Sequence, residues 1–368
     1  MLKSSKKLVA LMMALVIMVS TAACSTDKSW ALKNDSLTTP IGAYIYYLYY
    51  AYQDAESAKP DASKPVLEQK IDGKDAETYI KDKALNYTKM LFVINDKMKE
   101  LGLTLTADET KSIASTTDSQ WQQASSTLEK YGISKTSFNL VYSDYGVKSQ
   151  KIFSALYGKG GKKAVSDADL KSFFEKNFTD FNFIYAPMYS TDASGNAVAF
   201  TDAQKTTLKK EFDGYVTDIA AGKKTIRQAA DAYKTSSKQT ADPLQSVTAD
   251  LSSSTSYPAD LVTMLKAMKN GEVKAAEISG TYLIAVKNDI TKKTATELGT
   301  DNGRNSIIAQ LKGTEYSADM DKLAAAYTNV TINQKALDSY KPSMFVTATS
   351  SAAAATAPSA AASTASSK

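Results

Sequence analysis

The amino-acid sequence predicts an α+β protein in which a mainly helical module is split in sequence by a β/α domain. Three observations predict this class. The stretch Val66–Ala186 contains no proline, which suits helices. Short apolar runs typical of strands begin at Phe181 and recur within Glu272–Val286. A helical pattern then returns near Arg304 and continues to Ala326.

The clearest predicted helix is Ala76–Leu101, with Gly102 as its C-cap. Thr106 and Glu109 then form the sequence pattern of a capping box, which predicts the start of a second helix that ends before Gly132. A third helix is expected from Ser134 to about Tyr157. The apolar residues of the first helix are spaced alternately four and three positions apart, which places them on one face. They are Ile80, Ala84, Tyr87, Leu91, Ile94, Met98 and Leu101.

The segment Gly42–Gln53 holds six tyrosines and is apolar or aromatic on nearly every side when drawn as a helix. Two interpretations stay open, a buried core helix and one wall of an open aromatic groove. Core packing is favoured, because a tyrosine ring packs inside while its hydroxyl reaches the edge. Met90 and Met98 are further candidates for an adaptable apolar groove.

In the middle of the chain, the sequence pattern predicts a unit with the element order β-α-α-loop-α-β-β. Ser166 is expected to cap a short helix that precedes the strand Phe181–Met188, and Thr201 and Gln204 form a second capping box. A Ser/Thr-rich loop reaches Ser256. The remaining predicted elements are helices at 202–221, 226–233 and 257–268, strands at 272–278 and 281–286, and an extended segment at 329–334.

The composition excludes several classes of chemistry. The 368 residues include no histidine and one cysteine, so there is no histidine base, no catalytic triad and no internal disulfide. No metal or other cofactor is expected. The formal charge of +5 falls to +2 without Lys3, Lys6 and Lys7, and this balance gives no reason to expect a nucleic-acid partner.

Those three lysines precede the apolar run Leu8–Ser20, which is too short to span a bilayer and fits a signal peptide. The following Thr-Ala-Ala-Cys resembles the bacterial lipoprotein processing box. This resemblance implies cleavage before Cys24 and lipidation of its sulfur, so that the protein is anchored on the extracytoplasmic face of the cell membrane. An ordinary secretory signal is the alternative. At the other end, 346–368 is rich in Ala, Ser and Thr and is expected to be disordered.

The order of these elements resembles the PrsA and SurA class of extracytoplasmic foldases. In that class a helical chaperone module is split by a parvulin-type peptidyl-prolyl isomerase domain. The segments that carry the resemblance are KMKELGLTLTADE (97–109), SDADLKSFFEKNF (166–178), FIYA (183–186) and NGEVKAAEISGTYLIAVKND (270–289).

The resemblance implies a division of the chain into five parts. These are a signal peptide at 1–23, the first part of the chaperone module at 28–178, a parvulin-like domain at 179–290, a helix and strand at 291–345 that complete the chaperone module, and the tail at 346–368. It also places Phe183 and Tyr282 where parvulins carry two histidines. Tyr257 and Leu261, four residues apart, fall at the proline-ring pocket, and Ser252–Ser254 replaces a Gly-Asp-Leu-Gly segment.

We therefore expect a membrane-tethered foldase that binds unfolded or newly secreted polypeptides and has weak or no prolyl isomerase activity. Its oligomeric state stays open. An active parvulin-type isomerase is the first alternative, and a solute-binding or structural surface lipoprotein is the second. Ordinary core packing is the competing explanation for the four candidate pocket residues, because apolar and aromatic side chains in strands and helices are usually buried.

Overall fold

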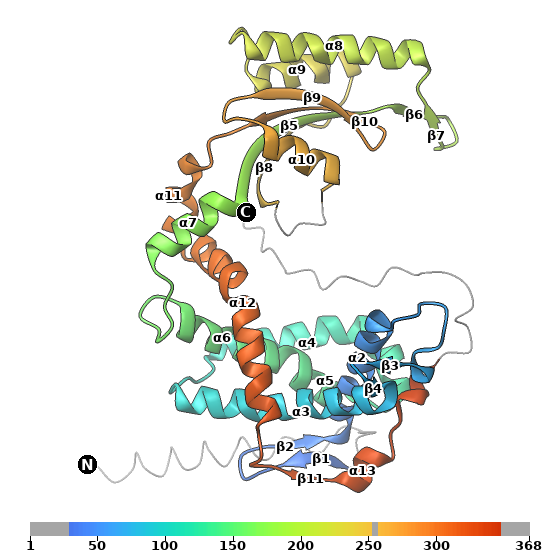
Figure 1. Cartoon of the computed structure of the whole chain (residues 1–368), viewed down its shortest axis with the longest axis vertical. Coiled ribbons are helices and arrows are strands. Elements are labelled where there is room, and N and C mark those ends of the chain that lie inside the picture. The colour runs from blue at the N-terminus through green and yellow to red at the C-terminus, as the bar shows by residue number, and fades with distance from the viewer. Residues whose placement is uncertain (1–28, 252–256, 347–368) are drawn as a thin grey trace. The chain divides into compact units, whose positions relative to one another are not determined.

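Helices and small antiparallel sheets build the described part of the chain, so the predicted α+β class is confirmed. The computed structural model describes residues 29–251 and 257–346 (Figure 1). The chain forms two compact units. Among the described residues, unit 1 comprises 29–155 and 315–346, and unit 2 comprises 156–251 and 257–314. Unit 2 is thus inserted in the sequence of unit 1, and its limits are wider than the predicted insertion 179–290.

Unit 1 is mainly helical, and its helices begin and end close to the predicted positions. Both halves of the Thr106–Glu109 capping box are formed, with Glu109 N–H donating to Thr106 Oγ1 at 3.1 Å. Gly102 and Gly132 have the positive φ angles expected after helix ends. The helices are α2 (Ile41–Ala58), α3 (Ala76–Glu100), α4 (Ala107–Leu128), α5 (Lys135–Phe138), a π-helical segment (Asn139–Asp144) and α6 (Tyr145–Tyr157).

A small sheet in unit 1 joins the two ends of the described chain. Strand β1 (Trp30–Lys33) pairs with β2 (Thr38–Pro40) on one side and with β11 (Thr331–Ile332) on the other. The extended segment predicted near 329–334 therefore exists, and it packs on the first strand. The hairpin β3 (Lys70–Ile71) and β4 (Lys74–Asp75), helix α13 (Gln334–Asp338) and the turn Pro342–Phe345 complete the unit.

Unit 2 contains a four-stranded antiparallel sheet in the order β8-β5-β10-β9. Its strands are β5 (Phe178–Pro187), β8 (Leu244–Asp250), β9 (Val273–Ile278) and β10 (Thr281–Lys287). Helices α8 (Asp202–Ala220) and α9 (Ile226–Ser237) cover one face, and α10 (Ala259–Ala267) lies on the other (Figure 1). The remaining elements are α7 (Asp167–Asn177), the hairpin β6 (Tyr189–Thr191) and β7 (Ala197–Ala199), α11 (Thr291–Gly299) and α12 (Asp301–Ala325), whose end belongs to unit 1.

Three local predictions for unit 2 are wrong. Strand β8 occupies part of the predicted Ser/Thr-rich loop, because pairing with β5 overrides a polar sequence with little strand signal. Helix α11 precedes the predicted final helix. Helix α10 starts at Ala259, after Tyr257, because Pro258 disfavours helical backbone at the residue before it.

Candidate functional site

A row of aromatic side chains runs along β5 on the face that α10 covers. Side chains alternate between the two faces of a strand, so Phe181, Phe183 and Tyr185 share one face. Their ring centroids are 5.7 Å apart for the first pair and 6.2 Å for the second. We call these three residues the aromatic row. The sequence signal was available in the alternation Phe-Asn-Phe-Ile-Tyr, but only Phe183 was singled out.

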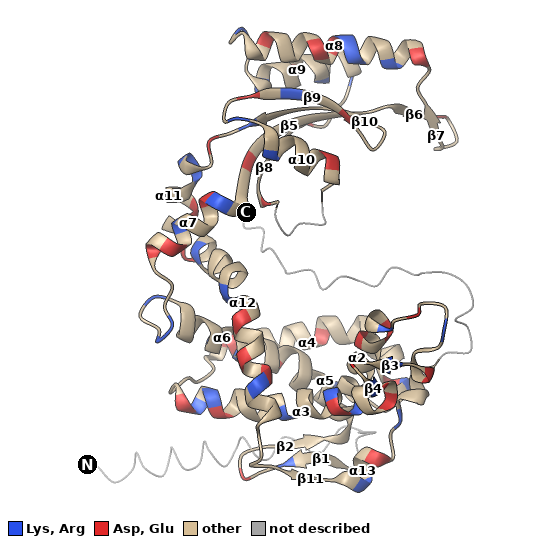
Figure 2. Ribbon diagram, in the orientation of Figure 1, with Lys and Arg blue, Asp and Glu red and all other residues tan. Residues whose placement is uncertain are grey.

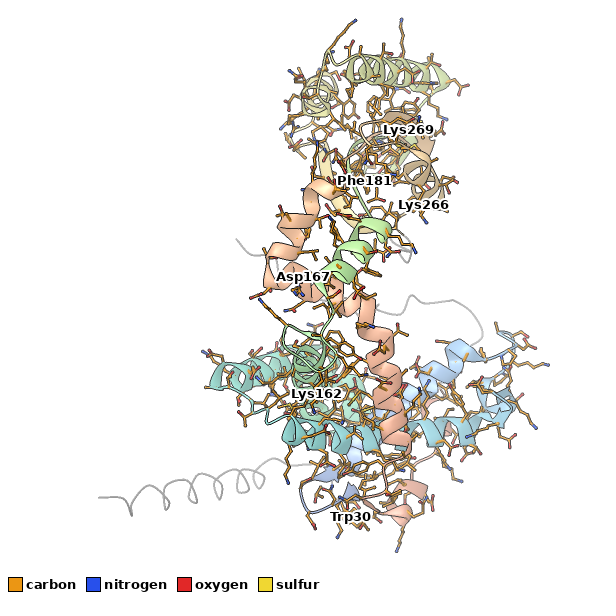
Figure 3. All side chains as sticks on the ribbon, turned by 60° about the vertical axis from the view of Figure 1, so that its left-hand side comes forward. Trp30, Lys162, Asp167, Phe181, Lys266 and Lys269 are labelled. Carbon is orange, nitrogen blue, oxygen red and sulfur yellow. The ribbon has the colours of Figure 1, made fainter. Side chains whose placement is uncertain are left out.

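The aromatic row passes from the core to solvent. Phe181 is fully buried, Phe183 is half-buried and Tyr185 is 45% exposed. Helix α10 has nine residues and covers only part of the row. Its Leu261 and Leu265 are buried in the same cluster as Phe181. Figure 3 marks Phe181 on the sheet and Lys266 on this helix. The exposed end of the row therefore offers apolar surface that no described helix covers.

Lys287 fixes α10 at the buried end of the row. Its Nζ donates hydrogen bonds to the carbonyl oxygens of Leu265 at 2.9 Å and Met268 at 3.0 Å. A cation at these carbonyls satisfies acceptors that a helix end leaves without partners. A side chain from β10 thus holds the helix over Phe181. At the other end of the row, Tyr185 is 45% exposed.

The two positions implied by the parvulin resemblance do not lie together. In the β5–β10 register, Phe183 is opposite Ala285 and Tyr282 is opposite Ala186. Phe183 therefore belongs to the face under α10, whereas Tyr282 packs with Phe212 under α8. Both strands lie close to their predicted positions, and the register places these two side chains on opposite faces of the sheet, so the two do not form one site.

Tyr282 belongs to a polar cluster at the edge of the α8 face. Its hydroxyl donates to Asp213 Oδ1 at 3.0 Å and accepts from Lys209 Nζ at 3.2 Å, and Lys209 lies 2.6 Å from Asp213 Oδ2. Burial raises the pKa of Tyr282, and the bond to Asp213 adds to this. The hydrogen bond from Lys209 lowers the pKa of Asp213. The cluster holds α8 on β10.

The two residues predicted for the proline-ring pocket, Tyr257 and Leu261, differ in burial. Leu261 is buried beneath α10 in the core, as the competing explanation of core packing expects. Tyr257 stays half-buried beside Phe181, with ring centroids 6.0 Å apart in an edge-on arrangement. Tyr257 therefore packs at the buried end of the aromatic row, and Leu261 belongs to the same cluster. Ser252–Ser254 lies outside the described residues.

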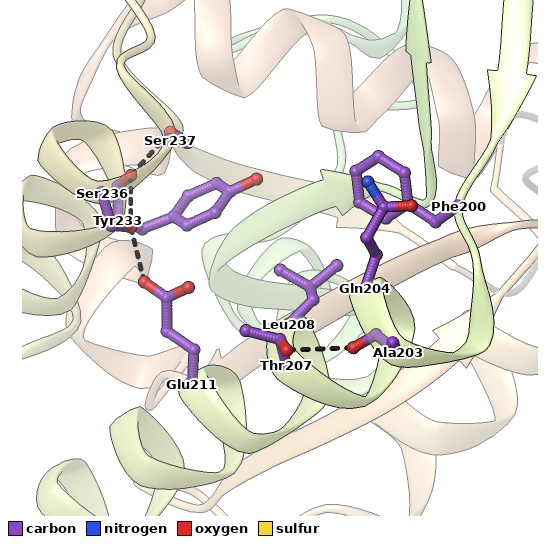
Figure 4. A pocket seen from close by; sticks show the side chains of 9 residues that line it. All are labelled: Phe200, Ala203, Gln204, Thr207, Leu208, Glu211, Tyr233, Ser236 and Ser237. Carbon is purple, nitrogen blue, oxygen red and sulfur yellow. Dashed lines mark hydrogen bonds between the residues drawn. The ribbon is translucent and has the colours of Figure 1, made fainter.

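A hollow of about 380 Å³ lies between α8 and α9 (Figure 4). Phe200, Leu208 and Tyr233 give it an apolar lining, and Glu211 is its one described carboxylate. That carboxylate already accepts hydrogen bonds from Ser236 at 2.5 Å and Tyr215 at 2.7 Å. Its polar group is therefore engaged in joining α8 to α9, and the aromatic row is the stronger binding candidate.

Unit 1 carries a second aromatic surface. Tyr50 and Tyr142 are 49% and 42% exposed, and Tyr46 and Phe138 lie between them. Phe138 stacks on Tyr142 at 5.0 Å across the π-helical segment, and Trp121 packs beside it. We call Tyr46, Tyr50, Phe138 and Tyr142 the tyrosine surface.

The core interpretation of the tyrosine-rich helix is confirmed for three of its tyrosines, and the groove interpretation stays a prediction. Tyr44, Tyr47 and Tyr52 are buried core residues, whereas Tyr46 and Tyr50 face the tyrosine surface. The suggestion that Met90 and Met98 line a groove is wrong, because both are buried on α3.

Charge and metal-ligand patterns add no competing site. Figure 2 shows Lys and Arg interspersed with Asp and Glu along the helices. The described residues contain no group of three or more His, Cys, Asp or Glu side chains placed to hold a metal ion. None of the described helices combines the length and apolar character needed to cross a membrane. Cys24 and the tail from Thr347 lie outside the described ranges.

The comparisons with known proteins found structural neighbours only. No family model matches the chain, and no curated protein matches it. The foldase protein PrsA from Lactococcus lactis aligns at 16% identity over 85% of this chain and 97% of its own, with a TM-score of 0.36. PrsA from Streptococcus pneumoniae aligns at 14% identity over 70% of this chain and 88% of its own, with a TM-score of 0.38. PrsA from Bacillus subtilis aligns at 16% identity over 76% of this chain and 91% of its own, with a TM-score of 0.28. We base the functional argument on the residues of this chain, since these TM-scores are below 0.5.

Proposed function

We propose that this protein is an extracytoplasmic foldase that binds unfolded polypeptides and has weak or no prolyl isomerase activity. The observation that carries the proposal is the aromatic row, which leaves the core and ends half exposed on an open sheet face. Unfolded chains expose apolar side chains, and covering these side chains with such a surface is favourable because it removes apolar area from water. Aromatic rings suit varied partners because they offer large, rigid contact areas.

The position of the polar groups around the aromatic row is the reason why we expect low isomerase activity. Rotation about an Xaa-Pro bond crosses a barrier of about 18–20 kcal/mol, and a polar site that recognises the twisted amide must lie beside an apolar pocket. The row offers rings and the Tyr185 hydroxyl. The cluster with ionised groups around Tyr282 lies on the opposite face of the sheet, and Lys274, which shares the face of Phe183 two strands away, is paired with Glu272 at 3.1 Å. Binding is therefore the stronger activity of this surface.

The tether is the second part of the proposal. A lipid on Cys24 holds the binding surfaces near the membrane, where secreted chains emerge, and this raises their effective concentration. Metabolic labelling with a radioactive fatty acid tests it. Wild-type protein should carry the label, and the Cys24→Ala variant should be unlabelled and released from the membrane.

Suppression of client aggregation tests the binding surface. We compare wild-type protein with Phe183→Ser/Tyr185→Ser and with Tyr50→Ser/Tyr142→Ser, at stoichiometric ratios to a reduced, unfolded client. The first variant should need on the order of tenfold more protein for half protection, because about 1.4 kcal/mol of lost contact energy corresponds to tenfold. If wild-type protein protects no client, the foldase proposal is wrong, and a structural or solute-binding lipoprotein becomes the better hypothesis.

The tyrosine surface provides a second candidate binding site within the same function. If the Tyr50→Ser/Tyr142→Ser variant loses protection while the first variant keeps it, the client binds unit 1. A prolyl isomerisation assay on a short Xaa-Pro peptide tests the alternative of an active enzyme. Rates far above the uncatalysed reaction would contradict the proposal of weak or absent activity.

A further inference from the structure

The hollow between α8 and α9, which we call the α8–α9 hollow, has apolar walls that are open to solvent. Figure 4 shows the rings of Phe200 and Tyr233 on either side of Leu208. Five of its nine lining residues are exposed, and they are Ala203, Gln204, Thr207, Ser236 and Ser237. A ligand therefore reaches the walls without displacing a helix. The volume of about 380 Å³ lies within the range of roughly 300–1,000 Å³ that is usual for ligand pockets.

Glu211 presents half of its carboxylate to this hollow. Ser236 and Tyr215 donate their hydrogen bonds to the same oxygen, Oε1, at 2.5 Å and 2.7 Å. Among the described residues no hydrogen-bond donor reaches the second oxygen, Oε2. Figure 4 shows this oxygen on the side of Leu208. The two hydroxyl groups therefore hold the carboxylate in place and leave one oxygen for a ligand.

No cation neutralises Glu211 within the part of the chain that the structure describes. The nine described residues that line the hollow include no Lys or Arg. Lys209, on the same helix, pairs with Asp213 at 2.6 Å instead. Burial raises the pKa of Tyr233, and the negative charge of Glu211 raises it further, so this charge acts on the wall of the hollow. The α8–α9 hollow thus combines an unbalanced negative charge with aromatic walls.

An arginine side chain matches this combination of groups. Its guanidinium is a permanent cation that donates hydrogen bonds to carboxylates, and its flat face packs on aromatic rings. Its methylene stem covers apolar wall while the charged end stays near water. A purely apolar ligand leaves the charge of Glu211 unpaired, and an anionic ligand is repelled by that charge.

We propose that the α8–α9 hollow binds an arginine side chain of an unfolded client, with the guanidinium at Glu211 Oε2 and the stem between Phe200 and Tyr233. This inference rests on the proposed function and adds a charge preference to it. The aromatic row lies on the other face of the sheet, so the two surfaces can be tested separately.

The direct test compares two peptides that differ by one charge. Both are fluorescent peptides of Gly and Ser around one Leu, and one carries arginine where the other carries citrulline, which is uncharged and nearly the same shape. Anisotropy with the full chain should show the arginine peptide binding about tenfold more tightly, because a hydrogen bond between charged groups is stronger than one to a neutral group. Equal affinities for the two peptides overturn the proposal.

A variant of Glu211 locates the charge preference. Glu211→Gln removes the charge and keeps an oxygen that Ser236 and Tyr215 can bond. It should weaken binding of the arginine peptide about tenfold and leave the citrulline peptide unchanged, which a double-mutant cycle measures. A loss of stability affects both peptides alike, so it does not imitate this result. Asp202→Asn, an exposed carboxylate of α8 outside the hollow, is the control and should change neither affinity. A preference for arginine that survives in Glu211→Gln overturns the proposal.

A matched pair of variants tests access to the hollow. Thr206 and Thr207 are both exposed on α8, and each hydroxyl donates to the carbonyl oxygen four residues earlier, at 2.7 Å and 2.9 Å. Only Thr207 lines the hollow. Thr207→Arg places a guanidinium one turn before Glu211, where it can pair with the carboxylate and occupy the hollow. It should weaken binding of the arginine peptide at least about tenfold, and Thr206→Arg should leave it unchanged. Wild-type affinity in Thr207→Arg contradicts the proposal.

The outcomes separate this inference from the proposed function. If the protein does not distinguish arginine from citrulline while Phe183→Ser/Tyr185→Ser loses client protection, the arginine site is wrong and the foldase proposal stands. If arginine is preferred through Glu211 while wild-type protein protects no client, the hollow is a site for basic peptides and the foldase proposal is wrong. Preference for arginine together with client protection supports both.

Discussion

The two faces of the sheet in unit 2 are covered to different extents. Helices α8 and α9, with 19 and 12 residues, bury Ile184, Phe212 and Tyr282 on one face. Helix α10, with nine residues, buries Phe181 on the other face and leaves Tyr185 45% exposed. Both faces carry apolar side chains in similar strand positions. The difference teaches that the extent of helix coverage separates a face that is closed core from one that ends in an exposed aromatic side chain.

The same contrast separates stability from binding. A buried aromatic side chain stabilises the fold because its removal leaves a cavity, whereas a half-exposed one contributes less to folding and more to contact with a partner. Variants on the two faces should therefore give opposite results in unfolding and binding experiments.

The largest expected effect is on the closed face. Phe212→Ala removes a fully buried ring that packs on Tyr233 at 4.9 Å and on Tyr282 at 5.7 Å. It should lower the free energy of unfolding of unit 2 by about 3–5 kcal/mol, measured by urea denaturation. Tyr185→Ser on the open face is the control and should cost less than about 1 kcal/mol. Equal losses would contradict the assignment of the two faces.

A smaller effect is expected at the end of α10. Lys287→Met removes both hydrogen bonds to the helix carbonyls and should cost about 1–3 kcal/mol. Hydrogen exchange should be faster at the α10 amides. Lys266→Met, on the exposed side of the same helix, should leave both measurements unchanged. An unaltered α10 in the Lys287 variant would show that packing on Phe181 alone holds the helix.

A metal-binding experiment tests whether Phe183 and Tyr282 lie on opposite faces. Tyr185 and Leu283 are directly opposite on one face, so Tyr185→His/Leu283→His should create a Ni²⁺ site. Saturating Ni²⁺ should then raise the free energy of unfolding by about 1–2 kcal/mol. Phe183→His/Tyr282→His should show no such increase. The chain has no native histidine, so the background is low. Stabilisation of the second pair would disprove the register.

The smallest effect concerns pH. Lys209 lowers the pKa of Asp213 below its ordinary value of 3.8, so the folded state binds a proton there less readily than the unfolded state. The stabilisation is present above about pH 4 and is lost as the pH falls through the folded-state pKa. Asp213→Asn should remove this part of the acid dependence, at less than about 1 kcal/mol because the pair is half exposed. Urea titrations between pH 2 and pH 7, covering roughly the carboxylate range, measure it.

Local signals predicted the helices better than the strands. The Thr106–Glu109 box and the Thr201–Gln204 box are both formed, because each depends on contacts within one turn. Strand β8 and helix α11 were missed. The sequence of β8 mixes apolar and polar residues with little strand signal, and it becomes a strand because β5 supplies its hydrogen-bond partners.

The candidate site was predicted in part. Phe183 and Tyr257 pack in the cluster under α10, whereas Tyr282 packs under α8, because the pairing of β5 with β10 turns Tyr282 to the other face. Tyr185 and Tyr142 were not predicted as contact residues, whereas Tyr46 and Tyr50 belong to the segment for which an open aromatic groove was one of the two interpretations. The exposure of Tyr185 and Tyr142 depends on the length of α10 and on the π-helical segment, which brings Tyr142 onto Phe138.

By itself, then, the sequence determined the α+β class, the helix limits set by capping residues and glycines, and the absence of histidine chemistry. Those properties depend on residue type and on neighbours within a few positions. Only the tertiary structure decided which aromatic residues are core and which face of the sheet is less covered by helices. These properties depend on register and on how far a helix covers a sheet, and both are set by contacts between residues distant in sequence.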